Sequence, residues 1–412
     1  MPEFYFGTDS NKIGEVKTND KTGKLVRVSL FPSAPNTYKM KDGVSTQVVV
    51  SHPTLPLVIS LTSFWNAHPS HLTCFETKEG DLAEVTGSDM PGREACHAMF
   101  YPKDNNQNKV TLACAHLHDG TVAFFQFSAK EIPKSLDDQP AMTIALPLLE
   151  AGTRRTLGTG KGLTSVPSSV HVFYAPNGNY LLVVDPNQSC IFTFQVDETG
   201  LPSSDQPSAT FKCHTDAPSL GWFSKIVNKI RGYSSCQPRR VAISPNDKYV
   251  FVSYEYQNVI QVYHIDQYGK IDPEQKGCMQ EVSTIDAALT SKKLIGLTFQ
   301  ASAECKVFGN SLYVSNRGDK VVAGKSENSI RIFDIRDGGR LASQHAVHCS
   351  GPVRHFCVYE KDGYDILIAG TTKPGMSLQT FQRKQGEESS QFELVGEADV
   401  GVSIFSVAPG SV

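Results

Sequence analysis

Charged residues flank two strand-like apolar runs between residues 236 and 269. Arg239 and Arg240 precede the first run, and Glu255 follows the second. Guanidinium groups bind carboxylates and phosphates through paired hydrogen bonds, and a glutamate beside them can serve as a general base. The same residues can instead form a salt bridge at the end of a hairpin, which contributes only about 0–1 kcal/mol at a surface. Residue type alone leaves both interpretations open.

Antiparallel pairing predicts that Arg239 and Glu255 lie close together. The turn between the two runs centres near Asp247, with Arg239 eight residues before it (247 − 239) and Glu255 eight residues after it (255 − 247). Residues equidistant from a tight turn lie opposite each other in an antiparallel pair. We therefore expect both side chains at the same end of one sheet.

A recurring unit extends this arrangement to the whole chain. The unit is an apolar strand, a turn rich in Pro, Asn, Asp and Gly, a second strand, a polar bend and a third strand. Six copies occupy residues 48–64, 97–128, 171–197, 239–266, 297–339 and 355–383. Their spacing of about 50 to 70 residues suits one four-stranded antiparallel sheet per copy.

The repeats predict an all-β, seven-bladed β-propeller of four-stranded antiparallel sheets, with residues 1–412 as a single domain. The lone N-terminal strand "EFYFGT" and the incomplete C-terminal set remain outside the six copies. We expect the N-terminal strand to complete a seventh blade and close the ring without a free edge. A β-sandwich is the competing fold, but it does not require a period of this length.

Polar residues recur at the matching end of each predicted blade. The same symmetry gives Val170 or His171 near Asp185, His97 near His116, Arg317 at the end of its own blade, and Arg354 near Ala369 and Gly370. In a propeller these ends converge on one mouth of the central channel. We therefore expect a binding pocket there, built around Arg239, Glu255 and Arg317.

One segment departs from the strand pattern. In "SLGWFSKIVNKIRGYSS" (residues 219–235), apolar residues recur at helical spacing. This predicts a short helical insertion packed on the propeller. A lid, or a docking site for a protein partner, is the functional alternative for the same helix.

Composition narrows the partners and the compartment. Lys and Arg number 39 against 42 Asp and Glu, a net charge of −3, so neither nucleic acid nor an anionic membrane is expected as a partner. No apolar run approaches the roughly 18 residues that span a bilayer, and the start lacks a signal-peptide pattern. The ten cysteines are scattered without a CxxC pair, which favours reduced thiols in the cytoplasm. No cluster has zinc-ligand spacing, so we expect no metal and no cofactor.

The sequence resembles the seven-bladed propeller lactonase family, which includes bacterial 6-phosphogluconolactonases and the fungal carboxy-cis,cis-muconate cyclase. "QPRRVAISPNDKYVFVSYEY" is similar to the family pattern "GPRH…P-G-K-Y…NEL", with Arg239 and Glu255 at the matching positions. "LYVSNRG" supplies Arg317, "VVDPNQSCIFTF" supplies Asp185, and "ACH" supplies His97.

The resemblance implies hydrolysis of a small anionic lactone or sugar acid, such as 6-phosphogluconolactone. Arg239 and Arg317 would hold the carboxylate or phosphate and stabilise the oxyanion, while Glu255 would activate a water. We expect these three residues to be catalytic. The expected substrate-binding residues are His97, His116, His171, Asp185, Arg240 and Arg354.

Three departures from the family pattern keep other functions open. Val170 stands where the family has a histidine, with His171 one position later. Arg240 replaces the histidine that follows the family's Pro-Arg pair, and "DKVVAGKSEN" is inserted after "SNRG". A lactonising cyclase of the carboxymuconate type uses the same groups. A noncatalytic propeller scaffold with a decayed lactonase site is the other alternative.

Overall fold

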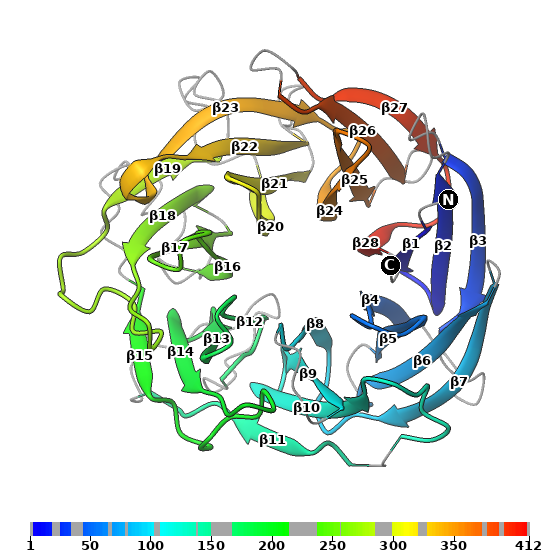
Figure 1. Cartoon of the computed structure of the whole chain (residues 1–412), viewed down its shortest axis with the longest axis horizontal. Helices are drawn as coiled ribbons and strands as arrows, with labels where there is room; N and C mark the ends of the chain where they lie inside the picture. Colours follow the sequence, from blue (N-terminus) through cyan, green and yellow to red (C-terminus); the bar gives the residue numbers. More distant parts are fainter. Residues whose placement is uncertain are drawn as a thin grey trace.

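The computed structural model describes most of the chain. The described residues are 3–18, 25–33, 44–64, 68–78, 81–102, 108–136, 139–149, 167–213, 237–255, 257–284, 299–319, 328–372, 377–386 and 391–409. They form strands β1–β28 and one 3-10 turn, η1 (Asp337–Gly339). The strands make seven four-stranded antiparallel sheets arranged as a ring (Figure 1).

Six blades follow one another along the chain, each running from an inner to an outer strand. Blade 1 contains β4 (Val44–Ser51), β5 (Leu57–Phe64), β6 (His71–Lys78) and β7 (Asp81–Asp89). Blade 2 contains β8 (Ala95–Phe100), β9 (Lys109–His116), β10 (Thr121–Ser128) and β11 (Met142–Ala145). Blade 3 contains β12 (His171–Tyr174), β13 (Tyr180–Asp185), β14 (Cys190–Gln195) and β15 (Ala209–Lys212).

The next three blades repeat this order. Blade 4 contains β16 (Pro238–Ile243), β17 (Tyr249–Tyr254), β18 (Val259–His264) and β19 (Gln280–Ser283). Blade 5 contains β20 (Phe299–Phe308), β21 (Ser311–Asp319), β22 (Ser329–Ile335) and β23 (Leu341–His348). Blade 6 contains β24 (Val353–Lys361), β25 (Tyr364–Thr371), β26 (Leu378–Lys384) and β27 (Glu393–Ala398). The predicted seven-bladed propeller is confirmed, and each of the six repeats corresponds to one of these blades.

Blade 7 joins the two ends of the chain, which lie side by side in Figure 1. Its inner strand is the C-terminal β28 (Ile404–Pro409), followed outward by β1 (Glu3–Thr8), β2 (Lys12–Thr18) and β3 (Leu25–Pro32). Tyr5 pairs with Ala408, and Gly7 pairs with Ser406. The N-terminal segment therefore contributes three strands to the closing blade, more than the single strand that was expected.

The hydrophobic core lies in layers between neighbouring blades. Strands β5 and β13 are buried along their whole length, because a sheet packs against each of their faces. Between blades 3 and 4, for example, Leu182 and Val184 share a buried cluster with Val241 and Val250. This double burial explains the continuous apolar runs of the middle strands, whereas the outer strands β7 and β27 are largely exposed or half-buried.

An extra residue interrupts the pairing of most inner strands. In β16, Pro238 pairs with Tyr254 and Arg240 with Ser253, so the register of the ladder skips Arg239. Arg354 in β24 and Cys96 in β8 are skipped in the same way, and β4, β20 and β28 are also irregular. A bulge of this kind re-aims side chains on the strand that carries it.

The helix expected at residues 219–235 lies outside the described residues, as does most of the insertion after "SNRG". Within the described part of the chain, η1 is the one helical element. No helix there is long and apolar enough to cross a membrane.

Two buried histidines outside the inner strands predict acid sensitivity. His52 Nδ1 accepts hydrogen bonds from Thr54 N and Leu55 N, at 3.2 and 3.1 Å. Burial lowers the pKa of His52, and likewise that of His116, from 6.5 to about 4. The unfolded chain therefore takes up these protons first as the pH falls. Their contribution to stability is complete above pH 6.5 and is lost on the way down to about pH 4.

We predict that His52→Asn will flatten the acid side of the stability profile, because Asn keeps the acceptor without titrating. The slope of the unfolding free energy between pH 6 and 5 should fall by about 1.4 kcal/mol per pH unit. His116→Asn should have a similar effect, and the double variant should show the sum. Denaturant unfolding at several pH values measures this, and an unchanged slope would contradict the assignment.

Candidate functional site

Three residues that are distant in sequence meet at the inner end of blades 4 and 5. Arg239 Nη1 donates a hydrogen bond to Glu255 Oε2 at 2.8 Å. Arg317 Nη2, from β21, donates to the other carboxylate oxygen, Glu255 Oε1. Each oxygen of Glu255 therefore accepts from a different arginine, and the structure brings together the three residues that the spacing predicted.

The backbone of Glu255 is held by both blades. Its N–H donates to Gln237 O at 3.0 Å within blade 4, and its carbonyl accepts from Ser302 N at 3.0 Å in blade 5. Glu255 follows Tyr254, the last residue of β17, which pairs with Pro238 next to the bulge at Arg239. The side chain is thus directed by two sheets rather than by a loop of its own.

Glu255 is an ionised carboxylate despite its burial. Its side chain is 9% exposed, and those of Arg239 and Arg317 are 18% and 12% exposed. Burial alone would raise the pKa of Glu255, but the charges and hydrogen bonds of the two arginines outweigh it and hold that pKa below the ordinary value. In this arrangement Glu255 is a weak base.

Arg354 supplies a third guanidinium. Its Cζ lies 4.2 Å from the centroid of the Phe405 ring, on the inner strand of the next blade. Burial, followed by repulsion from Arg317 and Arg239, lowers the pKa of Arg354 to about 9. No hydrogen bond or ion pair to its guanidinium occurs among the described residues. We call Arg239, Glu255, Arg317 and Arg354 the arginine cluster.

The arginine cluster carries more positive than negative charge. Three guanidinium groups face one carboxylate, and Glu94 is the other acid whose charge acts on Arg354. Glu94 itself pairs with His118, with its Oε2 2.5 Å from Nε2. An excess of buried, converging guanidinium groups attracts an anion. Sequence reasoning missed Glu94 and Phe405, because neither belongs to the motifs that indicated the site.

A second polar group is built around the residues that directly follow the skipped positions of β8, β16 and β24. It contains the expected residues His97, His171 and Arg240, together with Glu304, Lys306 and His355, which sequence reasoning missed. Arg240 Nε lies 3.4 Å from Glu304 Oε2, and the rings of His97 and His171 have centroids 4.1 Å apart. We call these six residues the axial network.

The contacts of Val170 and His171 show how each residue lies at the inner strand of blade 3. His171 Nδ1 accepts a hydrogen bond from Val241 N at 3.2 Å, and its ring packs on His97. Burial and nearby positive groups keep the pKa of His171 well below 6.5, so the ring is neutral near pH 7. Val170 is buried, and its carbonyl accepts from Arg240 Nη1 at 2.6 Å. His171 therefore belongs to the axial network.

The expected pairing of His97 with His116 is wrong. The bulge at Cys96 shifts the register by one residue, so His116 lies opposite Ala95 and His97 opposite Ala115. His116 Nδ1 lies 3.2 Å from Thr121 Oγ1, within its own blade. The structure does not bring this side chain to the arginine cluster.

Asp185 is occupied by the turn that follows β13. Its carboxylate accepts hydrogen bonds from Gln188 N at 2.9 Å, Gln188 Nε2 at 2.7 Å and Ser168 N at 3.2 Å. Burial raises the pKa of Asp185 to about 6, even though these bonds favour the ionised form. The contacts of Asp185 order the backbone on either side of the inner strand of blade 3.

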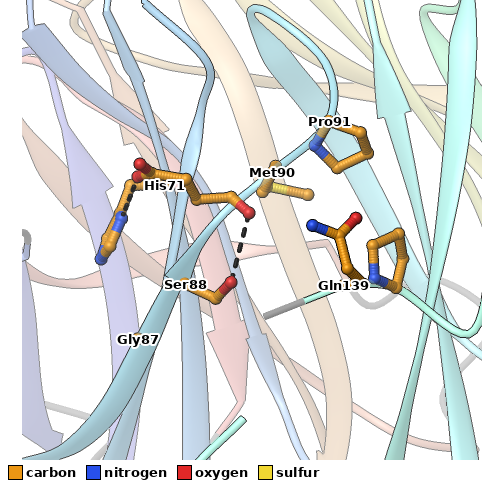
Figure 2. A pocket seen from close by; sticks show the side chains of 8 residues that line it. His71, Gly87, Ser88, Met90, Pro91 and Gln139 are labelled. Carbon is orange, nitrogen blue, oxygen red and sulfur yellow. Dashed lines mark hydrogen bonds and ion pairs between the residues drawn. The ribbon is translucent and has the colours of Figure 1, made fainter. Parts of the chain in front are cut away.

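Two pockets border other parts of the ring. One, of about 470 Å³, lies between β6–β7 and the segment at Gln139 and Pro140 (Figure 2). His71 Nδ1 lies 2.9 Å from Asp89 Oδ1 there, but the Ser88 hydroxyl donates to Asp89 O, so no serine–histidine pair forms. The other, of about 670 Å³, includes Phe211 and Lys270.

Metal chemistry has no evident site in the described part of the chain. No group of three or more His, Cys, Asp and Glu side chains there is arranged to hold an ion. The chemistry that the described residues offer is anion binding by arginine, with one carboxylate between two of the guanidinium groups.

Comparison with known proteins shows the family and the fold to which the chain is similar. A 6-phosphogluconolactonase of Bacillus subtilis (strain 168) is 24% identical over 314 residues, covering 75% of this chain and 71% of that protein. The structure of a periplasmic gluconolactonase from Pseudomonas aeruginosa aligns with a TM-score of 0.69 at 14% identity, over 100% of this chain and 99% of that one. A Lactobacillus plantarum protein aligns with a TM-score of 0.68 at 15% identity, over 99% of each chain.

At these identities the two structures show a shared fold. The family model described as "Lactonase, 7-bladed beta-propeller" matches residues 5–397, which is nearly the whole chain. The chain therefore belongs to the seven-bladed β-propeller lactonase family.

Proposed function

We propose that the protein hydrolyses the lactone of a small anionic sugar acid, such as 6-phosphogluconolactone, in carbohydrate metabolism. The observation that carries the proposal is the Glu255 carboxylate held between Arg239 and Arg317, near the guanidinium of Arg354, which contacts the Phe405 ring and, among the described residues, no carboxylate. Membership of the lactonase family and the Bacillus 6-phosphogluconolactonase relative support this substrate class.

Substrate binding would change the state of Glu255. A phosphate or carboxylate that binds Arg354 also competes for the guanidinium groups of Arg317 and Arg239. Each hydrogen bond withdrawn from Glu255 raises the pKa of that carboxylate, because its burial is then less compensated. The anion of the substrate thus converts Glu255 from a counter-charge into a base.

Hydrolysis follows from these groups without a cofactor. Glu255 takes a proton from a water, and the resulting hydroxide attacks the lactone carbonyl carbon. A guanidinium of Arg239 or Arg317 stabilises the oxyanion that forms. The ring C–O bond then breaks, and the leaving alkoxide receives the proton from Glu255, which yields the open-chain acid.

The alternatives from the sequence are separate outcomes of the same assay. Ring closure of a muconate-type acid uses these groups in the reverse direction. A noncatalytic scaffold is supported by the two hydrogen bonds that occupy Glu255 and by Val170 at the family's histidine position. A cytoplasmic location stays a prediction, because the Pseudomonas relative is described as periplasmic.

We predict that Glu255→Gln will lower kcat for lactone hydrolysis by about 100- to 10,000-fold, because Gln cannot accept the proton. Arg239→Met should cause a loss of about 100- to 1,000-fold by removing an oxyanion donor. Proton release from 6-phosphogluconolactone and simple δ-lactones, corrected for spontaneous opening, measures this. The exposed Glu274→Gln is the matched control and should be fully active.

The same assay on the wild-type protein distinguishes the hydrolase, the cyclase and the noncatalytic scaffold. Turnover of lactones supports the hydrolase, and turnover of muconate-type acids alone supports the cyclase. Anion binding without any turnover supports the scaffold. Full activity in Glu255→Gln would reject the proposed mechanism.

A second prediction concerns Arg354. Inorganic phosphate should raise the thermal midpoint of the wild-type protein by mass action. Arg354→Met should abolish that shift and raise KM for an anionic lactone by about 10- to 100-fold, since charged hydrogen bonds contribute about 1.5–3 kcal/mol. For an uncharged δ-lactone, KM should change little. Arg340→Met, at an exposed position, is the control, and an equal phosphate shift in both variants would contradict the role of Arg354.

A further inference from the structure

We propose that Arg240, Glu304 and His355 are positioning residues that hold Arg239 and Arg354 in their working geometry. The inference rests on the proposed function, because it assigns these residues to the same site. Nothing in the proposed mechanism requires them to touch the substrate.

Covalent adjacency connects the axial network to the arginine cluster. Arg240 follows Arg239 in β16, and His355 follows Arg354 in β24. In both strands the cluster residue is the one that the ladder skips. At a bulge the regular ladder does not set the direction of the skipped residue, so the contacts of the residue that follows it help to fix the local backbone. In both strands that neighbour is a member of the network.

Glu304 links the two neighbours. Its Oε2 lies 3.4 Å from Arg240 Nε and 3.3 Å from His355 Nε2, while its Oε1 accepts from Cys305 N at 3.1 Å. The Glu304 side chain is 1% exposed and that of Arg240 is 7% exposed. One carboxylate of blade 5 therefore joins the inner strands of blades 4 and 6.

The other ends of the network are also fixed. Arg240 Nη1 donates to Val170 O of blade 3 at 2.6 Å. His355 Nδ1 accepts from Val407 N of blade 7 at 3.1 Å, so its Nε2 carries the proton that faces Glu304. The chain of contacts runs from blade 3 to blade 7 through the residues that directly follow Arg239 and Arg354.

Three groups of the axial network carry charge. Arg240 and Lys306 are the cations and Glu304 is the acid; Lys306 Nζ lies 2.9 Å from Phe356 O and 3.3 Å from His355 Nε2. Burial, Lys306 and Arg240 keep the pKa of His355 well below 6.5, and His97 and His171 are shifted in the same direction. The imidazoles are neutral donors and acceptors at neutral pH, which suits a rigid frame.

A buried ion pair can also be merely a stability element, and a double variant separates the two roles. Removing one partner leaves a buried charge, but removing both is often close to neutral for stability. Arg240→Met should therefore lower the thermal midpoint strongly. Arg240→Met combined with Glu304→Gln should recover much of that loss, because the Glu304 carboxylate is no longer left without Arg240, while the half-buried Lys306 keeps its contact with Phe356 O.

Activity should not recover with stability in the double variant. Loss of the Arg240 contacts frees Arg239, and a displacement of about 1 Å near the reacting atoms costs on the order of 100-fold in kcat. A kcat that returns to the wild-type value together with the thermal midpoint would overturn the proposal. Arg240→Lys is the second variant should Arg240→Met not fold: it keeps the charge but cannot reproduce both guanidinium contacts, so kcat should fall while stability is largely retained.

A matched ion pair elsewhere provides the control. Arg383 Nη2 lies 2.5 Å from Asp365 Oδ2 within blade 6 and donates to Tyr313 Oη of blade 5 at 3.2 Å, so Arg383 also combines an ion pair with a contact between blades. Arg383→Met should lower the thermal midpoint and leave kcat unchanged at assay temperatures below unfolding. A comparable loss of kcat in this variant would show that ion-pair removal acts non-specifically.

A readout without substrate distinguishes failure of this inference from failure of the proposed function. Crystal structures of Arg240→Lys and of the double variant should show Arg239 Nη1 moved out of hydrogen-bonding distance of Glu255 Oε2. An Arg239–Glu255 contact kept at 2.8 Å in both variants would overturn the positioning role. If the wild-type protein hydrolyses no lactone, the proposed function fails, and this measurement still decides the inference.

Discussion

The extra residue in the inner strands is the constraint on which the site depends. Regular pairing would turn consecutive side chains to opposite faces of a sheet. The bulges at Arg239 and Arg354 change this alternation and re-aim the side chains. The skipped residue of each strand joins the arginine cluster, and the next residue joins the axial network. The ring then brings the bulges of different blades together, so residues far apart in sequence become partners without any long loop to place them.

Burying the charged groups of the arginine cluster costs desolvation free energy. Glu255 is held ionised because two guanidinium groups compensate for its burial, and Arg354 contacts the Phe405 ring and, among the described residues, no carboxylate. Desolvated charges of one sign favour a ligand of the opposite sign far more than exposed charges do. In the proposed function the same balance would set the strength of Glu255 as a base, so that binding and proton transfer would share one set of residues.

The sequence predicted the fold and the central trio because both follow from local patterns. Strand repeats with a constant period define blades, and counting from the turn at Asp247 places Arg239 and Glu255 at one end of the same sheet. Counting does not give the exact register, because the bulges at Arg239 and Cys96 each shift the pairing. Glu304 and His355 were missed because the counting selects strand ends, whereas Glu304 lies in an irregular stretch of β20 and His355 follows the bulge at Arg354.

The order of blade 7 has a consequence for folding kinetics. Phe405, on which Arg354 packs, belongs to β28, and β28 pairs with β1, from which the strands of all six other blades separate it along the chain. Pairing of such distant segments is slow, because the entropy of closing a long loop opposes it. We therefore expect the wall beside Arg354 to form after the local hairpins of the other blades.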